Sequence, residues 1–223
     1  MHGSRPLTAV LSGMLDLLLP PACLACGVRT PGPEALLCPA CAALLDEADA
    51  DALRAEILAD AALDDAVARF RYRPDGPLAP VLHALKYGQR PRYGRLLGRS
   101  LAALDLAPAD ALVPMPLHRA RYLERGYNQA EEIAHGLAEV ADLPVRTDLL
   151  ARLVFTDTQT KRTRHDRAAN VAHAFDAASD ADGKRLWVVD DVLTTGATSR
   201  AAADALKAAG AAWVGVAAVA WTS

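Results

Sequence analysis

The sequence has no cysteine after residue 41, few aromatic residues, and no strong excess of either charge. Its 223 residues carry a net charge of −3 at pH 7 with a pI near 6.1. A protein with this balance is not drawn as a whole to nucleic acid or to an anionic membrane. The charge is nevertheless uneven, because acids prevail in residues 42–66 and bases prevail in residues 69–99. We therefore expect an acidic linker followed by a locally basic surface that suits an anionic ligand.

Long uninterrupted apolar runs are also missing. The N-terminal run LTAVLSGMLDLLLPP follows Arg5 but contains Asp16, and no small-residue cleavage pattern follows it. No other segment approaches the roughly 18 apolar residues of a membrane span. We expect an amphipathic N-terminal helix packed on the body of the protein, no membrane span, and a cytoplasmic location.

All the cysteines lie between residues 23 and 41, in two C-x-x-C pairs. Structural zinc takes four thiolates in tetrahedral geometry, and a two-residue spacer turns both sulfurs of a pair toward one ion. Two disulfides are a rival interpretation, although a chain without an export signal meets reducing conditions. Redox-active or metal-free thiols are a third possibility. The favoured interpretation is a structural zinc ribbon, whose predicted ligands are Cys23, Cys26, Cys38 and Cys41.

After the cysteines, strand patterns alternate with helix patterns. Strands are expected at residues 64–73, 109–116, 185–191 and 212–222, and helices at 41–63, 76–88, 93–106, 128–143 and 197–210. Strands that are apolar throughout and alternate with helices indicate a parallel sheet covered on both faces. A polar, basic segment with a short strand signal at each end spans residues 152–175. We expect an N-terminal helix, ribbon and acidic linker helix in residues 1–60, and an α/β domain in residues 61–223.

The stretch LWVVDDVLTTGATSRAA places two acids directly before a turn and a helix. Asp190 and Asp191 follow a buried strand, and ligands of open α/β sheets bind at the carboxyl ends of the strands. The first N–H groups of the next helix have no partners within the helix, so the turn suits an anion. Carboxylates beside a phosphate must face something else, such as sugar hydroxyls or Mg²⁺. The pattern predicts a site for a phosphorylated sugar, with the phosphate bound by Thr194, Thr195, Gly196, Ala197 and Thr198. Taken singly, residues of these types more often only end a strand and cap a helix.

The string VVDDVLTTGAT resembles the 5-phosphoribosyl-1-pyrophosphate (PRPP) signature of type I phosphoribosyltransferases. The order of a four-cysteine ribbon, LKYGQR, VPMPLHRARYLERGYNQA, TQTKRTRHDRAANVAHAF and this loop resembles the ComF family of competence proteins, from about Leu15 onward. One departure is mild: where the family's pattern reads L-S-R-x-x-R-x-x-N, this chain has Thr163, Arg164 and Arg167, closed by Asn170.

The resemblance implies a type I phosphoribosyltransferase-like α/β fold behind the zinc ribbon. It also implies binding of PRPP with Mg²⁺ and a role in DNA uptake during natural transformation, alongside single-stranded DNA and other competence proteins as possible partners. If turnover occurs, Asp190 and Asp191 would be the catalytic residues that hold the ribose while pyrophosphate leaves. The loop at 114–118 would receive that pyrophosphate. The other implied PRPP-binding residues are Pro116, Leu117, His118, Arg125, Lys161, Arg162, Arg164 and Arg167.

Two further functions stay open. One is a non-catalytic module that senses PRPP or handles single-stranded DNA, using basic stretches 69–99 and 161–167 with interleaved aromatic residues. The second is a nucleotide-salvage phosphoribosyltransferase. Lys86 faces the site or lies on the surface, and Asn128 contacts the ligand or caps a helix. The aromatic residues interleaved with the basic stretches are Phe70, Tyr72, Tyr87 and Tyr93. We interpret four histidines as structural: His83, His135, His165 and His173.

Overall fold

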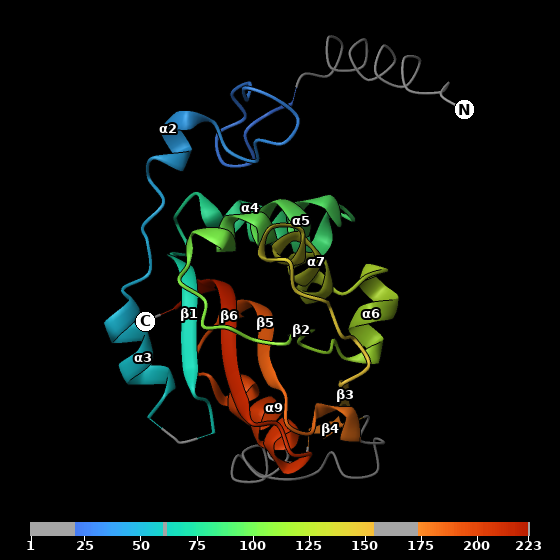
Figure 1. Ribbon diagram of the computed structural model, residues 1–223. Helices are drawn as coiled ribbons and strands as arrows, with labels where there is room; N and C mark the ends of the chain where they lie inside the picture. The colour runs from blue at the N-terminus through green and yellow to red at the C-terminus, as the bar shows by residue number, and fades with distance from the viewer. Residues whose placement is uncertain (1–20, 60–61, 154–173, 223) are drawn as a thin grey trace, which may run out of the picture.

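A four-stranded parallel sheet forms the centre of the computed structural model, which describes residues 21–59, 62–153 and 174–222 (Figure 1). The strands are β1 (Asp65–Arg71), β2 (Ala111–Pro114), β5 (Arg185–Leu193) and β6 (Trp213–Trp221). Their order in the sheet is β1-β6-β5-β2, and every pairing is parallel. The expected parallel α/β sheet is confirmed. The implied PRPP-binding residues Lys161, Arg162, Arg164 and Arg167 lie outside the described residues, as do His165 and His173.

Helices flank this sheet, and a short antiparallel pair of strands stands apart from it. The helices are α2 (Pro39–Ala42), α3 (Ala50–Ile57), α4 (Leu78–Tyr87), α5 (Arg92–Ser100), α6 (Arg119–Arg125), α7 (Gln129–Ala141) and α9 (Ala197–Ala208), with 3-10 turns η1 (Leu101–Ala103) and η3 (Ser179–Ala181). The pair is β3 (Leu150–Arg152) and β4 (Phe175–Ala177), which are the two strand signals expected at the ends of the basic segment. Among the described helices, none has the length and apolar character needed to span a bilayer.

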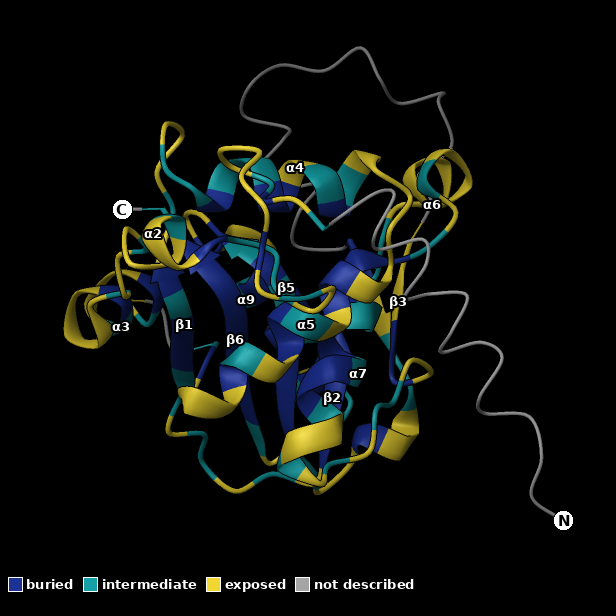
Figure 2. Cartoon of the chain, turned by 90° about the horizontal axis from the view of Figure 1, so that it is seen from above, coloured by how far each residue is buried: buried dark blue, intermediate teal, exposed yellow. Residues whose placement is uncertain are grey.

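The two faces of the sheet have separate apolar cores. On one face, α3 and α9 contribute Leu53, Ile57 and Leu206, all fully buried. On the other, α4, α5 and α7 pack against alternate residues of the same strands, including the fully buried Trp187. Figure 2 shows the strands as buried, while exposed residues gather on the outer helices. Coverage on both faces explains why the strands read as continuous apolar runs in the sequence.

Helices α5 and α7 approach each other closely because small residues line their contact. A Cβ on Gly136 would overlap the backbone of Arg95, and one on Gly98 would overlap the backbone of Ile133. Ion pairs flank the contact at the surface, with Arg95 Nε 2.9 Å from Glu132 Oε2. The spacing between these two helices is therefore set by glycine.

The expected linker helix at residues 41–63 is wrong over its first part. Residues 43–49 are not helical, and Glu47 forms an antiparallel bridge with Phe70 of β1. Helix α3 begins after Asp49, whose carboxylate accepts hydrogen bonds from the amides of Asp51 and Ala52 at 3.1 Å each. This N-cap is a start signal that the periodicity alone did not reveal. The boundary at residue 60 remains a prediction, and α3 itself contributes to the core beside β1.

A tight turn carries the first cysteine pair of the ribbon, and the second pair lies at the start of α2 and within it. Cys23 N–H donates to the carbonyl of Val28 at 2.8 Å, and Gly27 between them has φ +76°, a conformation that favours glycine. Leu24, Leu36 and Leu37 are half-buried against the core that contains α4 and α5. The ribbon thus has an apolar contact with the main body, next to the ion pair of Arg99 and Glu34 at 3.6 Å.

Candidate ligand site at the carboxyl edge of the sheet

The acid pair lies near the carboxyl end of β5, two residues before the strand ends. Asp191 is 5% exposed, and its Oδ2 lies 2.6 Å from Nζ of Lys86, in the last turn of α4. Lys86 therefore faces the site and does not extend over the outer surface. Burial and the neighbouring Asp191 carboxylate raise the pKa of Asp190 well above its ordinary value, whereas Lys86 opposes the rise. Keeping two neighbouring carboxyl groups largely away from water therefore costs electrostatic free energy, and a bound ligand can offset this cost.

The turn after β5 is open to solvent. Thr194, Thr195, Ala197 and Thr198 are exposed, while Gly196 is buried with φ +72° and precedes the first residue of α9. Helix N-termini present unpartnered N–H groups and partial positive charge, which attract anions. The backbone and hydroxyl donors that the sequence predicted for a phosphate are thus accessible and adjacent to the acid pair.

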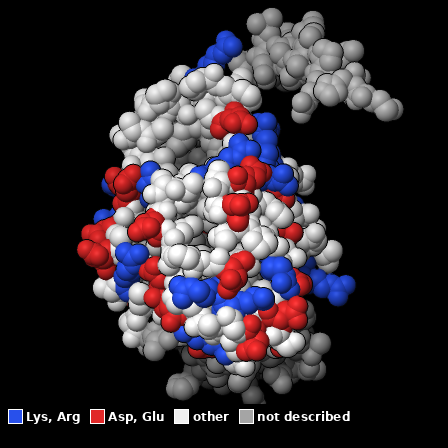
Figure 3. Space-filling model, viewed as in Figure 1, with Lys and Arg blue, Asp and Glu red and all other residues white. Residues whose placement is uncertain are grey.

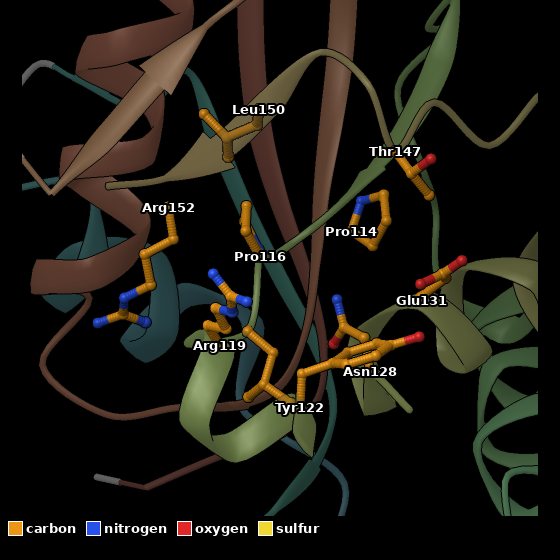
Figure 4. A pocket seen from close by; sticks show the side chains of 10 residues that line it. Pro114, Pro116, Arg119, Tyr122, Asn128, Glu131, Thr147, Leu150 and Arg152 are labelled. Atoms are coloured by element: carbon orange, nitrogen blue, oxygen red, sulfur yellow. The ribbon is translucent and has the colours of Figure 1, made fainter. Parts of the chain in front are cut away.

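A cavity of about 270 Å³ lies at the end of β2, beside the loop expected to receive pyrophosphate (Figure 4). Pro116 and Leu117 of that loop line it, together with Arg119 from α6 and Arg152 from β3. Sequence reasoning missed both arginines. Arg119 directly follows the loop 114–118, so its place in the sequence could have identified it. Arg152 is distant from this loop in the sequence and reaches the cavity only because of the position of β3. Two guanidinium groups make this cavity suitable for an anion.

His118 and Asn128 act as helix caps. The amide of Ala120 donates to Nδ1 of His118 at 3.2 Å, which starts α6. Asn128 is 9% exposed, accepts from the amide of Ala130 at 3.1 Å, and donates from Nδ2 to the carbonyl of Met115 at 3.0 Å. The capping interpretation of Asn128 is confirmed. Through Met115, Asn128 also fixes the loop that follows β2.

Arg125 lies in a second cavity of about 200 Å³, lined also by Lys86, Tyr87, Gln89 and Glu124. Its guanidinium is 5.8 Å from the centre of the Tyr87 ring and donates to the side-chain oxygen of Gln129. Because Lys86 lines the same cavity, Arg125 belongs to the α4 side of the site. Its predicted contact with a phosphate remains a prediction.

The cysteines form the metal-ligand cluster found among the described residues. Their four sulfurs lie within 4.8 Å of one another, as one ion between them would require, and Cys23 and Cys38 are buried. This geometry fits tetrahedral zinc with all positions filled by protein. Mg²⁺ at the ligand site would find two carboxylates, and this ion characteristically takes its other ligands from water and substrate phosphates. Both donor sets therefore fit the expected ions.

Comparison with known proteins shows which proteins this chain is similar to. The phosphoribosyl transferase domain model matches residues 123–221. Competence protein F of Haemophilus influenzae is 32% identical over 133 residues, covering 55% of this chain and 58% of that protein. DNA utilization protein YhgH of Escherichia coli is 30% identical over 148 residues, covering 63% and 65%. Competence protein ComFC of Bacillus subtilis is 29% identical over 144 residues, covering 65% and 53%.

The chain thus spans between about half and two thirds of the length of these relatives. The matched domain contains the end of the 119–125 helix, the acid pair, the open turn after β5 and the last strand of the sheet. The four-cysteine unit precedes it, as the resemblance of the motifs implied. The matched domain, the named relatives and this arrangement support the resemblance of the chain to the ComF family.

Proposed function

We propose that the chain binds PRPP with Mg²⁺ at the carboxyl edge of the sheet and serves the uptake or use of DNA. The observation that carries the proposal is the adjacency of an acid pair, the half-buried Asp190 and the buried Asp191, to an exposed turn at the N-terminus of α9. Paired carboxylates repel a phosphate unless they face hydroxyls or a metal ion, so this combination suits a phosphorylated sugar. The DNA role is taken from the names of the relatives.

Each part of the site has a task in this proposal. The turn Thr194–Thr198 holds the 5-phosphate through amides and hydroxyls, and the acids accept from the ribose hydroxyls. Loop 114–118 receives the pyrophosphate, with Arg119 and Arg152 in the adjoining cavity. Mg²⁺, when bound, supplies positive charge to the pyrophosphate. In turnover, the bond between the anomeric carbon and pyrophosphate breaks while an acceptor atom bonds to that carbon and gives up its proton.

The hypothesis of a single-stranded DNA module loses part of its support. Phe70 and Tyr93 are 9% and 5% exposed, so their rings cannot stack on bases. Arg90 and Arg92 lie over the Tyr93 ring, at 5.7 and 5.4 Å from its centre. Figure 3 shows basic and acidic groups intermixed on the face in view. Tyr87, which is 56% exposed, is the stacking candidate that remains from the predicted set, with Tyr72 half-buried.

Binding and biology need separate tests. Calorimetry with PRPP and Mg²⁺ should show at least about a tenfold loss of affinity for Asp190→Ala or Asp191→Ala, the size expected when a charge-assisted hydrogen bond is removed. A chromosomal copy with both changes should fail to support transformation at normal protein level. The matched control, Asp105→Ala with Asp204→Ala, removes two exposed acids, one ahead of β2 and one within α9, and should transform normally.

The hypothesis of a single-stranded DNA module makes the opposite prediction. In that case the double aspartate variant transforms normally, while Tyr87→Ala loses both single-stranded DNA binding and transformation. Release of pyrophosphate from PRPP, measured with candidate bases or with single-stranded DNA, then separates an enzyme from a sensor.

A further inference from the structure

Arg200 joins the turn after β5 to a helix from a distant part of the chain. It lies in the first turn of α9, and its Nη2 donates to the carbonyl of Thr195 at 2.7 Å. Its Nη1 donates to the carbonyl of Ile57 at 3.3 Å. Ile57 is the last residue of α3, where helix carbonyls have no partner within the helix. One guanidinium thus contacts the candidate phosphate turn and the end of α3 together.

The hydrogen bond to Thr195 determines which way the turn presents its amides. In a planar trans peptide, the carbonyl and the following N–H point in opposite directions. The structure has no cis peptide bond among its described residues. Because the carbonyl of Thr195 is directed to Arg200, the N–H of Gly196 is directed away from Arg200. Arg200 therefore turns this donor away from α3 and adds positive charge behind it.

Gly196 shows how closely the turn is packed onto this support. A Cβ at this position would lie 2.9 Å from Nη1 of Arg200 and 3.0 Å from Cδ1 of Ile57. Its φ of +72° also favours glycine. Ile57 is fully buried, so the surface behind the turn is part of the core. The turn consequently cannot move back toward α3 without displacing packed side chains.

We infer that Arg200 is a positioning residue of the phosphate turn, and that α3 is part of the support of the ligand site. The ligand in this inference rests on the proposed function. Helix α3 follows the segment that leads from the cysteine ribbon, so the N-terminal part of the chain and the phosphate turn share a hydrogen-bonded contact. Coupling of this kind is reciprocal: if α3 steadies the turn, a ligand on the turn steadies α3.

The test compares Arg200→Met and Arg200→Lys with the control Lys207→Met. Methionine preserves much of the side-chain length without donors, and lysine keeps the charge but not the forked pair of donors. Lys207 lies on the same helix and pairs with Asp64 at 2.8 Å, so its variant also loses one positive charge and one ion pair. Amide exchange of residues 53–58 and 194–198 is measured in the ligand-free protein. Affinities for ribose 5-phosphate and for PRPP with Mg²⁺ are measured by calorimetry.

We expect Arg200→Met to speed exchange in both segments and to weaken ribose 5-phosphate binding about tenfold, the usual loss for a hydrogen bond with a charged donor. Arg200→Lys should show smaller changes, and Lys207→Met none in these segments. Wild-type exchange in Arg200→Met, or equal changes in Lys207→Met, overturns the inference. If Arg200→Met does not fold, Arg200→Lys decides: unchanged exchange at residues 194–198 overturns it. If the unaltered protein binds neither ligand, only the proposed function is contradicted. The role of Arg200 and α3 is still tested in that case, because amide exchange is measured without ligand.

Discussion

Nζ of Lys86 lies 2.6 Å from Oδ2 of Asp191, and this ion pair joins α4 to β5 across the candidate site. The carboxylate is almost entirely enclosed, whereas the lysine side chain is 30% exposed. An enclosed charge needs a partner, since leaving it alone in a low-dielectric environment is costly. In the ligand-free protein, a residue from outside the strand supplies that partner.

Lys86→Met should destabilise the ligand-free protein by about 1–3 kcal/mol, because it leaves the buried Asp191 carboxylate uncompensated. Urea unfolding measures the loss. Combining Lys86→Met with Asp191→Asn should recover most of it, which gives a coupling energy for the pair. Strictly additive effects of the two changes would show that the ion pair contributes nothing to folding.

Asp190→Asn should raise the melting temperature at pH 7. Burial and Asp191 raise the pKa of Asp190 above its ordinary value of 3.8. The folded protein therefore retains a proton that the unfolded chain releases above pH 3.8, so this group lowers stability as the pH rises. For a chain of this size, each kcal/mol recovered corresponds to about 2–4 °C. The gain should vanish below about pH 3, where the carboxyl is protonated in both states.

A lower melting temperature for Asp190→Asn at pH 7 would contradict this reasoning. Asp148→Asn serves as a control of opposite sign. Its hydrogen bond with Arg146 lowers the pKa of Asp148 to about 2, so its contribution is present above pH 3.8 and is lost as the pH falls through about 2.

Gly136→Ala should destabilise the protein by about 1–3 kcal/mol, the usual cost of overpacking, because the added methyl group meets the backbone of Arg95. Backbone cannot rotate away as a flexible side chain can. Gly32→Ala is the matched control, since a Cβ there has no neighbour within 4 Å among the described atoms. Equal unfolding midpoints for the two variants would show that α5 and α7 can separate without loss.

The cysteine cluster should yield one zinc per chain by elemental analysis of protein purified without chelator. Cys38→Ser should abolish zinc binding and expose Leu36 and Leu37, while the far-ultraviolet spectrum of the sheet and its helices stays largely unchanged. Two disulfides by mass spectrometry, or absence of metal, would disprove the zinc assignment. Global unfolding of Cys38→Ser would show instead that the ribbon and the sheet fold as one unit.

The sequence was sufficient for features whose chemistry is local. Cysteine spacing anticipated the cluster of sulfurs, and apolar runs anticipated the parallel strands, including the one that ends just after the acid pair. Contacts between segments that are distant in the sequence could not be predicted in this way. Until the position of α4 is known, Lys86 could lie on the outer surface or face the site. Likewise, the sequence around Arg200 in the first turn of α9 does not indicate a contact with Ile57.

The linker at residues 41–63 shows a second reason why a prediction from sequence can fail. Helical periodicity ran through residues 41–63, but the carboxylate of Asp49 caps α3 and the preceding residues extend to pair with β1. Acid-rich segments satisfy a helical pattern readily, so the cap at Asp49 decided the start of the helix. Asp46, Asp49 and Asp51 all precede Leu53, the first buried residue of α3, so the sequence offered several candidate caps and did not single out Asp49.

The position of β6 has a consequence for the order of folding. Among the described strands β6 comes last in the sequence, yet it lies between β1 and β5 and is the strand of the sheet that pairs with β1. During synthesis, β1 must wait for roughly 150 residues before its neighbour emerges, because Asp65 pairs with Gly215. Until then β1 has the bridge with Glu47 and the cover of nearby helices such as α3 and α4, but not its neighbouring strand, which makes the nascent chain prone to aggregation. Translation beyond Trp213 is therefore the step that closes the sheet.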